Sequence, residues 1–165
     1  PVTLISPQTQ ICDNMKDLFD SSGNYMKTAC FVEKVSSYDA ADAFFKANGM
    51  ESYSTTTADE YTEAKNWLTI MFGRGSGAEI WPSVKLIGDH WTTSDGKLLF
   101  SGAVPTQNLG QGFCALFSND NGNFELIVKD CAVSSASIGE FFDETKKSLT
   151  IIVRIPIDPE TYSCG

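Results

Sequence analysis

Hydrophobic positions recur at helical spacing in two segments of the chain. The pattern predicts a first helix over Tyr38–Asn48, where Ala41, Phe44 and Phe45 form one apolar stripe. Gly49 follows this segment and is typical of a helix stop.

A second helix is predicted to begin at Thr57–Glu60, whose Thr-Ala-Asp-Glu sequence matches a capping box. Gly73 is expected to end this helix, and the segment 74–77 to be a flexible link. Between these limits apolar residues recur every three or four positions, which indicates packing against a core: Tyr61, Ala64, Trp67, Leu68 and Met71.

After Gly77 the pattern changes to short apolar runs separated by Gly, Asn, Asp and Ser, which is typical of strands and loops. Lys97–Gln111 has little regular pattern and is predicted to be a long loop. Helices followed by segregated strands favour an α+β fold over a repeating βαβ sheet. Strands are expected at 30–35, 80–87 (one region), 113–117, 124–128 and 149–157.

The order and spacing of several motifs resemble those of a C-type lectin-like domain over about residues 29–145. The matching segments, in chain order, are Cys30-Phe31-Val32, Tyr38–Ala41, Phe44–Gly49, Thr57–Glu60, Val84–Ile87, Trp91–Gly96, Phe100–Pro105, Cys114 and Cys131. The resemblance implies two helices with small antiparallel sheets and a long loop region. It makes residues 1–28 an N-terminal extension or hairpin, 29–145 the domain, and 146–165 a C-terminal β-prone extension.

The resemblance also implies a disulfide framework. It pairs Cys114 with Cys131 at the base of the long loop, and Cys12 with Cys30 as an N-terminal hairpin bridge. Cys164 is then left for a bond to another chain, although pairing of Cys12 with Cys164 stays open. Spaced cysteines in an acidic chain fit an oxidising compartment, so the protein is expected to be secreted, and buried cytosolic thiols are the alternative.

A third bridge of the family, between the first helix and the last strand, is absent. At the positions that resemble its two cysteines the chain has Phe45 and Phe142. We expect the two rings to be buried and to replace the covalent bond by an apolar contact.

The calcium ligands of sugar-binding members of the family are also absent. Val104-Pro105-Thr106 stands where the family has Glu-Pro-Asn or Gln-Pro-Asp, and Leu126–Val128 stands at the second ligand position. Calcium needs six to eight oxygen ligands, so no metal and no other cofactor is expected here. The resemblance implies that Pro105 shapes the loop, in the cis form. The remaining acidic candidates are Asp89, Asp95, Asp120 and Asp130, and Asn119–Gly122 fits a hairpin turn better than a calcium loop.

Charge, hydropathy and residue content disfavour three other classes of protein: nucleic-acid binders, membrane-inserted proteins and enzymes. The 165 residues carry 12 Lys and Arg against 21 Asp and Glu, a net charge of −9 that disfavours nucleic-acid partners. No apolar run is long enough for membrane insertion. His90 is the single histidine, and no nucleophile with a partner can be identified, so an enzyme is disfavoured.

The sequence therefore indicates a non-catalytic extracellular binding module that recognises a protein ligand or surface without calcium. A weakly carbohydrate-binding lectin and a structural domain of a larger assembly, linked through Cys164, are the alternatives. The candidate residues for contact with the ligand are Trp91, Phe100, Thr106, Gln107, Asn108, Leu109 and Gln111, which we call the contact set. For its two aromatic members, Trp91 and Phe100, packing in the core is the competing interpretation. The β-prone tail, Leu149–Ile155 above all, is expected to join the sheet or pack on the domain.

Overall fold

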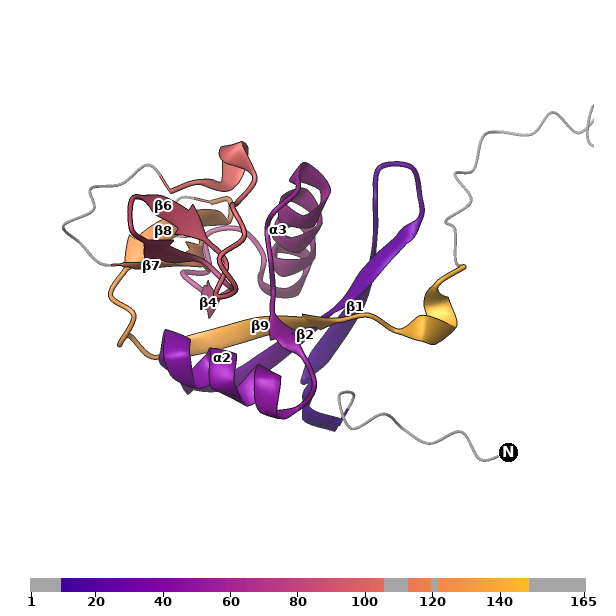
Figure 1. The fold of residues 1–165 in the computed structure, drawn as a ribbon, viewed down its shortest axis with the longest axis horizontal. Helices are drawn as coiled ribbons and strands as arrows, with labels where there is room; N and C mark the ends of the chain where they lie inside the picture. Colours follow the sequence, from indigo (N-terminus) through magenta and orange to yellow (C-terminus); the bar gives the residue numbers. More distant parts are fainter. Residues whose placement is uncertain (1–9, 106–112, 120–121, 149–165) are drawn as a thin grey trace, which may run out of the picture.

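The computed structural model describes residues 10–105, 113–119 and 122–148. One nine-stranded sheet connects the described strands, with two α-helices packed against it (Figure 1). The elements are β1 (Asn14–Phe19), β2 (Tyr25–Ser36), α2 (Tyr38–Ala47), β3 (Glu51–Ser52), α3 (Ala58–Phe72), β4 (Glu79–Trp81), β5 (Lys85–Ile87), β6 (His90–Thr92), η1 (Ser101–Ala103), β7 (Cys114–Ser118), β8 (Glu125–Lys129), β9 (Ser135–Phe141) and η3 (Glu144–Lys146).

Both predicted helices are confirmed, together with the signals that limit them. The Thr57 side chain accepts a hydrogen bond from the Glu60 backbone N–H, and the Glu60 carboxylate accepts one from the Thr57 backbone N–H, which completes the capping box at the start of α3. Gly73 ends α3 with a positive φ of 76°. Ser37 is the N-cap of α2. These ends are fixed locally, which is why the sequence shows them.

The strands confirm the α+β class but form one sheet rather than several small ones. Its order is β1-β2-β9-β4-β7-β5-β6, with β3 added to β9 and β8 added to β7. All strand pairs are antiparallel except β4 with β9, which run parallel. The expected single strand region at 80–87 is two strands, β4 and β5, which both pair with β7.

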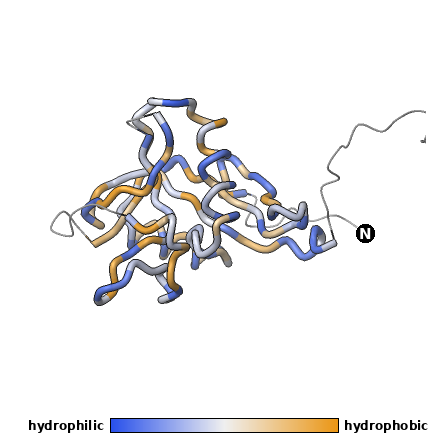
Figure 2. Tube along the Cα trace, turned by 90° about the horizontal axis from the view of Figure 1, so that it is seen from above, coloured by the Kyte–Doolittle hydropathy of each residue, from blue (hydrophilic) through white to orange (hydrophobic). Residues whose placement is uncertain are grey.

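The main core lies between α3 and the sheet, and hydrophobic and hydrophilic residues alternate along the chain around it (Figure 2). A second cluster under α2 contains Cys30, Val32, Phe45 and Met50. A third joins Tyr38 and Trp81 to the Cys114–Cys131 end of the sheet. In Figure 1, α2 and α3 lie on opposite sides of β9.

The expected contact between Phe45 and Phe142 is wrong. Phe45 is fully buried, but its ring faces the backbone of Gly139, where a Cβ atom would lie 2.5 Å from Phe45 Cδ1. Phe142 is 47% exposed, and its ring packs on Tyr25 at 5.2 Å. Because alternate residues of a strand point to opposite faces, Gly139 rather than Phe142 meets α2.

Candidate binding surface of the long loop

The strands below the long loop are set by two tight turns. Ile87 pairs with His90 across a two-residue turn, in which Gly88 has a φ of 61°. In the next turn the Gly96 N–H donates to the Thr93 carbonyl at 3.0 Å, and Gly96 has a φ of 83°. The chain therefore turns at Ser94–Gly96.

Both expected disulfides are present. Cys114 on β7 is bonded to Cys131 after β8, which fixes the base of the long loop. Cys12 is bonded to Cys30 on β2, which removes the alternative pairing of Cys12 with Cys164. Cys164 itself lies outside the described residues.

The first part of the long loop is held against α3. The Phe100 N–H donates to the Thr55 carbonyl at 2.9 Å, and its half-buried ring lies 6.4 Å from that of Tyr61. A side chain at Gly102 would overlap this ring, since its Cβ would lie 2.5 Å from Phe100 Cε2. Glycine thus allows Phe100 to turn inward.

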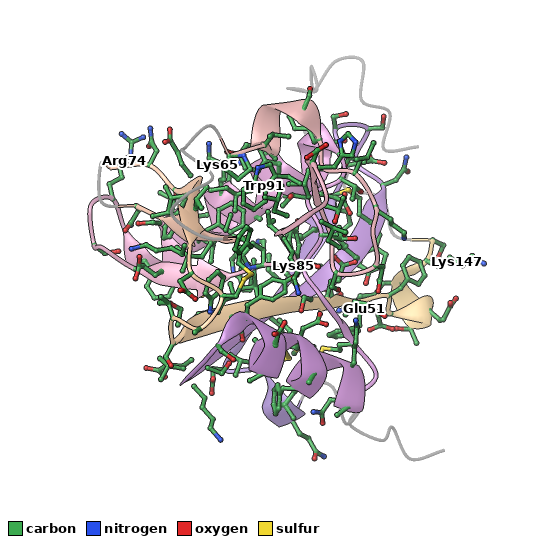
Figure 3. All side chains as sticks on the ribbon, turned by 60° about the vertical axis from the view of Figure 1, so that its left-hand side comes forward. Glu51, Lys65, Arg74, Lys85, Trp91 and Lys147 are labelled. Atoms are coloured by element: carbon green, nitrogen blue, oxygen red, sulfur yellow. A yellow bond between two sulfur atoms is a disulfide. The ribbon has the colours of Figure 1, made fainter. Side chains whose placement is uncertain are left out.

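The sequence-based contact set is only partly described by the structure. Trp91 is 7% exposed and packs in the main core (Figure 3), and Phe100 packs beside it, which fits the core-packing interpretation for both. Five members of the set lie outside the described residues: Thr106, Gln107, Asn108, Leu109 and Gln111.

Four large apolar side chains at the long loop and its base are exposed instead, and we call them the loop surface. They are Leu98 (63%), Phe113 (62%), Ile87 (47%) and Val104 (38%). The backbone brings the segments of Leu98, Ile87 and Phe113 together: Leu98 pairs with Thr92 on β6, β6 pairs with β5, and the Phe113 carbonyl accepts a hydrogen bond from the Leu86 N–H at 2.7 Å. Sequence analysis missed all four, because hydrophobicity alone does not show which residues the fold leaves exposed.

Apolar side chains occupy the positions at which sugar-binding members of the family have their calcium ligands. Leu126 and Val128 are buried on β8, and Val104 is half-exposed without a side-chain oxygen. Pro105 is buried, and none of the described peptide bonds is cis, so the cis expectation for Pro105 is wrong. Within the described ranges no group of three His, Cys, Asp or Glu residues could hold a metal ion.

The structure describes several of the other oxygen-bearing candidates. The buried Asn119 amide donates to the Gly73 carbonyl and to Ser76 Oγ, both at 2.8 Å, and so fastens the link after α3. The Gly122 N–H donates to the Asn119 carbonyl, as the hairpin-turn interpretation requires, although Asp120 lies outside the described residues. Asp130 accepts a hydrogen bond from the Ala132 backbone. Asp89 is exposed.

Charged groups tie α2 to the turn at Ser94–Gly96. Lys46 Nζ lies 2.9 Å from Asp42 Oδ2 and 3.6 Å from Asp95 Oδ1. The hydrogen bond to Asp42 raises the pKa of Lys46. Nearby, burial and the charge of Asp95 raise the pKa of Glu51.

A buried lysine that sequence analysis did not notice lies on the α3 side of the sheet. Lys27 on β2 forms salt bridges with Glu60 and, at 2.7 Å, with Glu140, and its Nζ also donates to both oxygens of Ser54. The same Nζ lies 4.3 Å from the centre of the Tyr53 ring. This cluster joins β2, α3 and β9, and its groups already satisfy one another.

The single histidine of the chain lies at the surface. His90 is exposed on β6, where its neighbour Trp91 turns into the core. The helices described here are all too short or too polar to cross a bilayer.

Neither protein-family models nor curated protein sequences match the chain. Solved structures do match. Human lithostathine superposes with a TM-score of 0.61 at 15% identity, over 86% of this chain and 97% of its own. A Ca²⁺-independent C-type lectin, SPL-2 from Saxidomus purpuratus, gives 0.55 at 15% identity, over 74% and 94% of the two chains.

A third structure, the complex of SPL-1 with GlcNAc, gives a TM-score of 0.57 at 13% identity and covers 79% of this chain and 96% of that chain. These similarities confirm the C-type lectin-like fold indicated by the motifs. At such identities they establish the fold alone.

Proposed function

We propose that this chain is a non-catalytic extracellular binding module that recognises a protein ligand through the loop surface, without calcium. The exposure of Leu98, Phe113, Ile87 and Val104 at one end of the sheet carries this proposal. Isolated exposed apolar residues are common, but exposed apolar residues on neighbouring segments suit an interface. An exposed phenylalanine such as Phe113 is among the residue types enriched at such surfaces.

Calcium independence is supported by the residues at the resembling ligand positions. Val104, Leu126 and Val128 offer no side-chain oxygen, and two of them are buried. The similarity to SPL-2, a Ca²⁺-independent lectin by its description, shows that this fold occurs with such behaviour. The two disulfides fit an extracellular location. In this proposal 29–145 is the domain, with extensions at 1–28 and 146–165.

Carbohydrate binding is the second candidate, because two similar structures contain sugars. SPL-1 was solved with GlcNAc, and the lectin domain of murine dendritic cell inhibitory receptor 2 with an N-glycan. A glycan array read with calcium and with EDTA tests this candidate. Glycan binding that EDTA abolishes would contradict the loss of calcium ligands.

A printed panel of secreted proteins and cell-surface ectodomains tests the protein-binding proposal. We expect hits that persist in EDTA and that are lost in Leu98→Ser and Phe113→Ser. Ile70→Ser is the matched control, because Ile70 is an aliphatic residue of α3 that is 80% exposed and is not part of the loop surface. Hits that all variants retain equally would refute the role of the loop surface.

A further inference from the structure

Two grooves meet at Phe141, at the end of the sheet away from the long loop. One, of about 230 Å³, is lined by Met15, Lys16, Asp17, Thr28, Phe141, Asp143 and Lys146. The other, of about 490 Å³, is lined by Lys46, Gly49, Met50, Glu51, Glu140, Phe141 and Phe142. Phe141 borders both, so the two grooves lie next to each other at the end of β9, and we call them together the depression.

The lining of the two grooves mixes charged side chains with four large apolar ones, Met15, Met50, Phe141 and Phe142. Phe142 and Met15 are both exposed, and Met50 forms part of the floor. Helix α2 ends at Ala47, so it covers Gly139 but does not extend over Phe142. An apolar segment could therefore be buried here.

The described chain leads directly to this depression. After β9 it forms η3, where Lys146 lines the smaller groove and contacts Asp17 Oδ1 at 2.8 Å. Figure 3 shows Lys147 and Glu51 on the same side of the molecule, and Arg74 at the opposite side. Whatever follows Ser148 therefore starts at the groove wall.

The sequence that follows has the composition of a buried strand. Leu149-Thr150-Ile151-Ile152-Val153-Arg154-Ile155 contains five aliphatic residues and one charge. Seven extended residues span about 23 Å. The positive charge of Arg154 suits the rim, where Glu51 forms no salt bridge with any described residue.

We propose that the segment Leu149–Ile155 packs in extended form across the two grooves that flank Phe141, in the same molecule. Covalent attachment at Ser148 gives the segment a high effective concentration at the groove, which favours the segment over a separate chain. The packed segment covers Phe142 and Met15 and brings Arg154 to the acidic rim at Glu51. This surface is separate from the loop surface, so the two proposals stand or fall independently.

Limited digestion of the full chain with an arginine-specific protease tests the proposal, because the sequence has two arginines, Arg74 and Arg154. Arg74 is exposed in a glycine-containing link and serves as the internal reference. We expect cleavage after Arg154 to be at least about tenfold slower than in a synthetic peptide of residues 147–161, since protection tracks the population of the undocked segment.

Substitution of the groove should release the segment. Phe142→Glu, Met15→Glu and Ile152→Glu are each expected to speed cleavage after Arg154 several-fold while the rate at Arg74 stays unchanged. Ile70→Glu should change neither rate. The proposal would be overturned if the wild type were cleaved after Arg154 as fast as the peptide. It would also be overturned if the groove variants left the rate of this cleavage unchanged. Protection that disappears on dilution would also overturn it, because it would place the segment on a second copy.

Discussion

The ring of Phe45 on α2 lies directly against the backbone of Gly139 on β9. A Cβ atom at Gly139 would lie 2.5 Å from Phe45 Cδ1 and 2.6 Å from Cε1. Phe45 is fully buried there, in the cluster that includes the Cys12–Cys30 disulfide. The large Phe45 and the very small Gly139 thus join α2 to β9, the two elements that the third disulfide of the family would connect.

Gly139→Ala should destabilise the protein by about 1–3 kcal/mol, because the added methyl group overpacks this contact. Urea unfolding followed by circular dichroism measures the loss. The double variant Phe45→Leu/Gly139→Ala should recover part of it, since the smaller side chain makes room. Simple additivity of the two single variants would show that the contact does not limit packing.

The residues that sequence analysis placed correctly are those with local signals. Thr57 and Glu60 lie three positions apart, and Gly73 marks a helix end, so short-range spacing is enough to find them. The disulfide partners followed from the resemblance, whose motif order survives in the chain.

Residues whose environment depends on distant strands were misplaced or missed. The partner of Phe45 depends on the register in which Cys30 pairs with Gly139, and no local pattern reveals that register. No local pattern marks Lys27 as buried, because its partners Glu60 and Glu140 lie 33 and 113 residues away. The exposure of Leu98 and Phe113 likewise depends on the packing of the whole sheet.

Lys27→Met should destabilise the protein by about 3–5 kcal/mol at neutral pH, because it leaves Glu60 and Glu140 together without their shared cation. Urea unfolding at pH 7 measures this loss. Lys16→Met, a change of the same kind at an exposed position of β1, is the control and should cost far less. Equal losses in the two variants would contradict a central role for the buried lysine.

Cys164 should form an intermolecular disulfide when the chain is produced in an oxidising compartment. The two bridges of the fold use four of the five cysteines, which leaves Cys164 without a partner inside the framework. A non-reducing gel is expected to show a dimer that Cys164→Ser abolishes, while Arg74→Ser leaves it in place. A monomer with one thiol that reacts with a maleimide would count against this prediction.

Acid should weaken the protein partly through Glu60. Burial acts to raise the pKa of this carboxyl, but the charge of Lys27 and hydrogen bonds from Lys27, Thr56 and the Thr57 backbone outweigh it, so the pKa is lowered. As the pH falls, Glu60 therefore binds a proton at a higher pH in the unfolded chain than in the folded chain. The stabilisation is therefore complete above the ordinary glutamate pKa of about 4.3 and is lost as the pH falls toward the lower folded value.

Glu60→Gln should accordingly lower the unfolding free energy at pH 7 and flatten its decline between about pH 5 and 3, because glutamine has no proton to gain. Unfolding curves in urea at several pH values provide the measurement. Glu63→Gln on the same helix is the control, since Glu63 forms no salt bridge with a described residue and should leave the wild-type slope intact. If Glu60→Gln keeps the full acid slope, protonation elsewhere governs acid unfolding and the Lys27 cluster is not its cause.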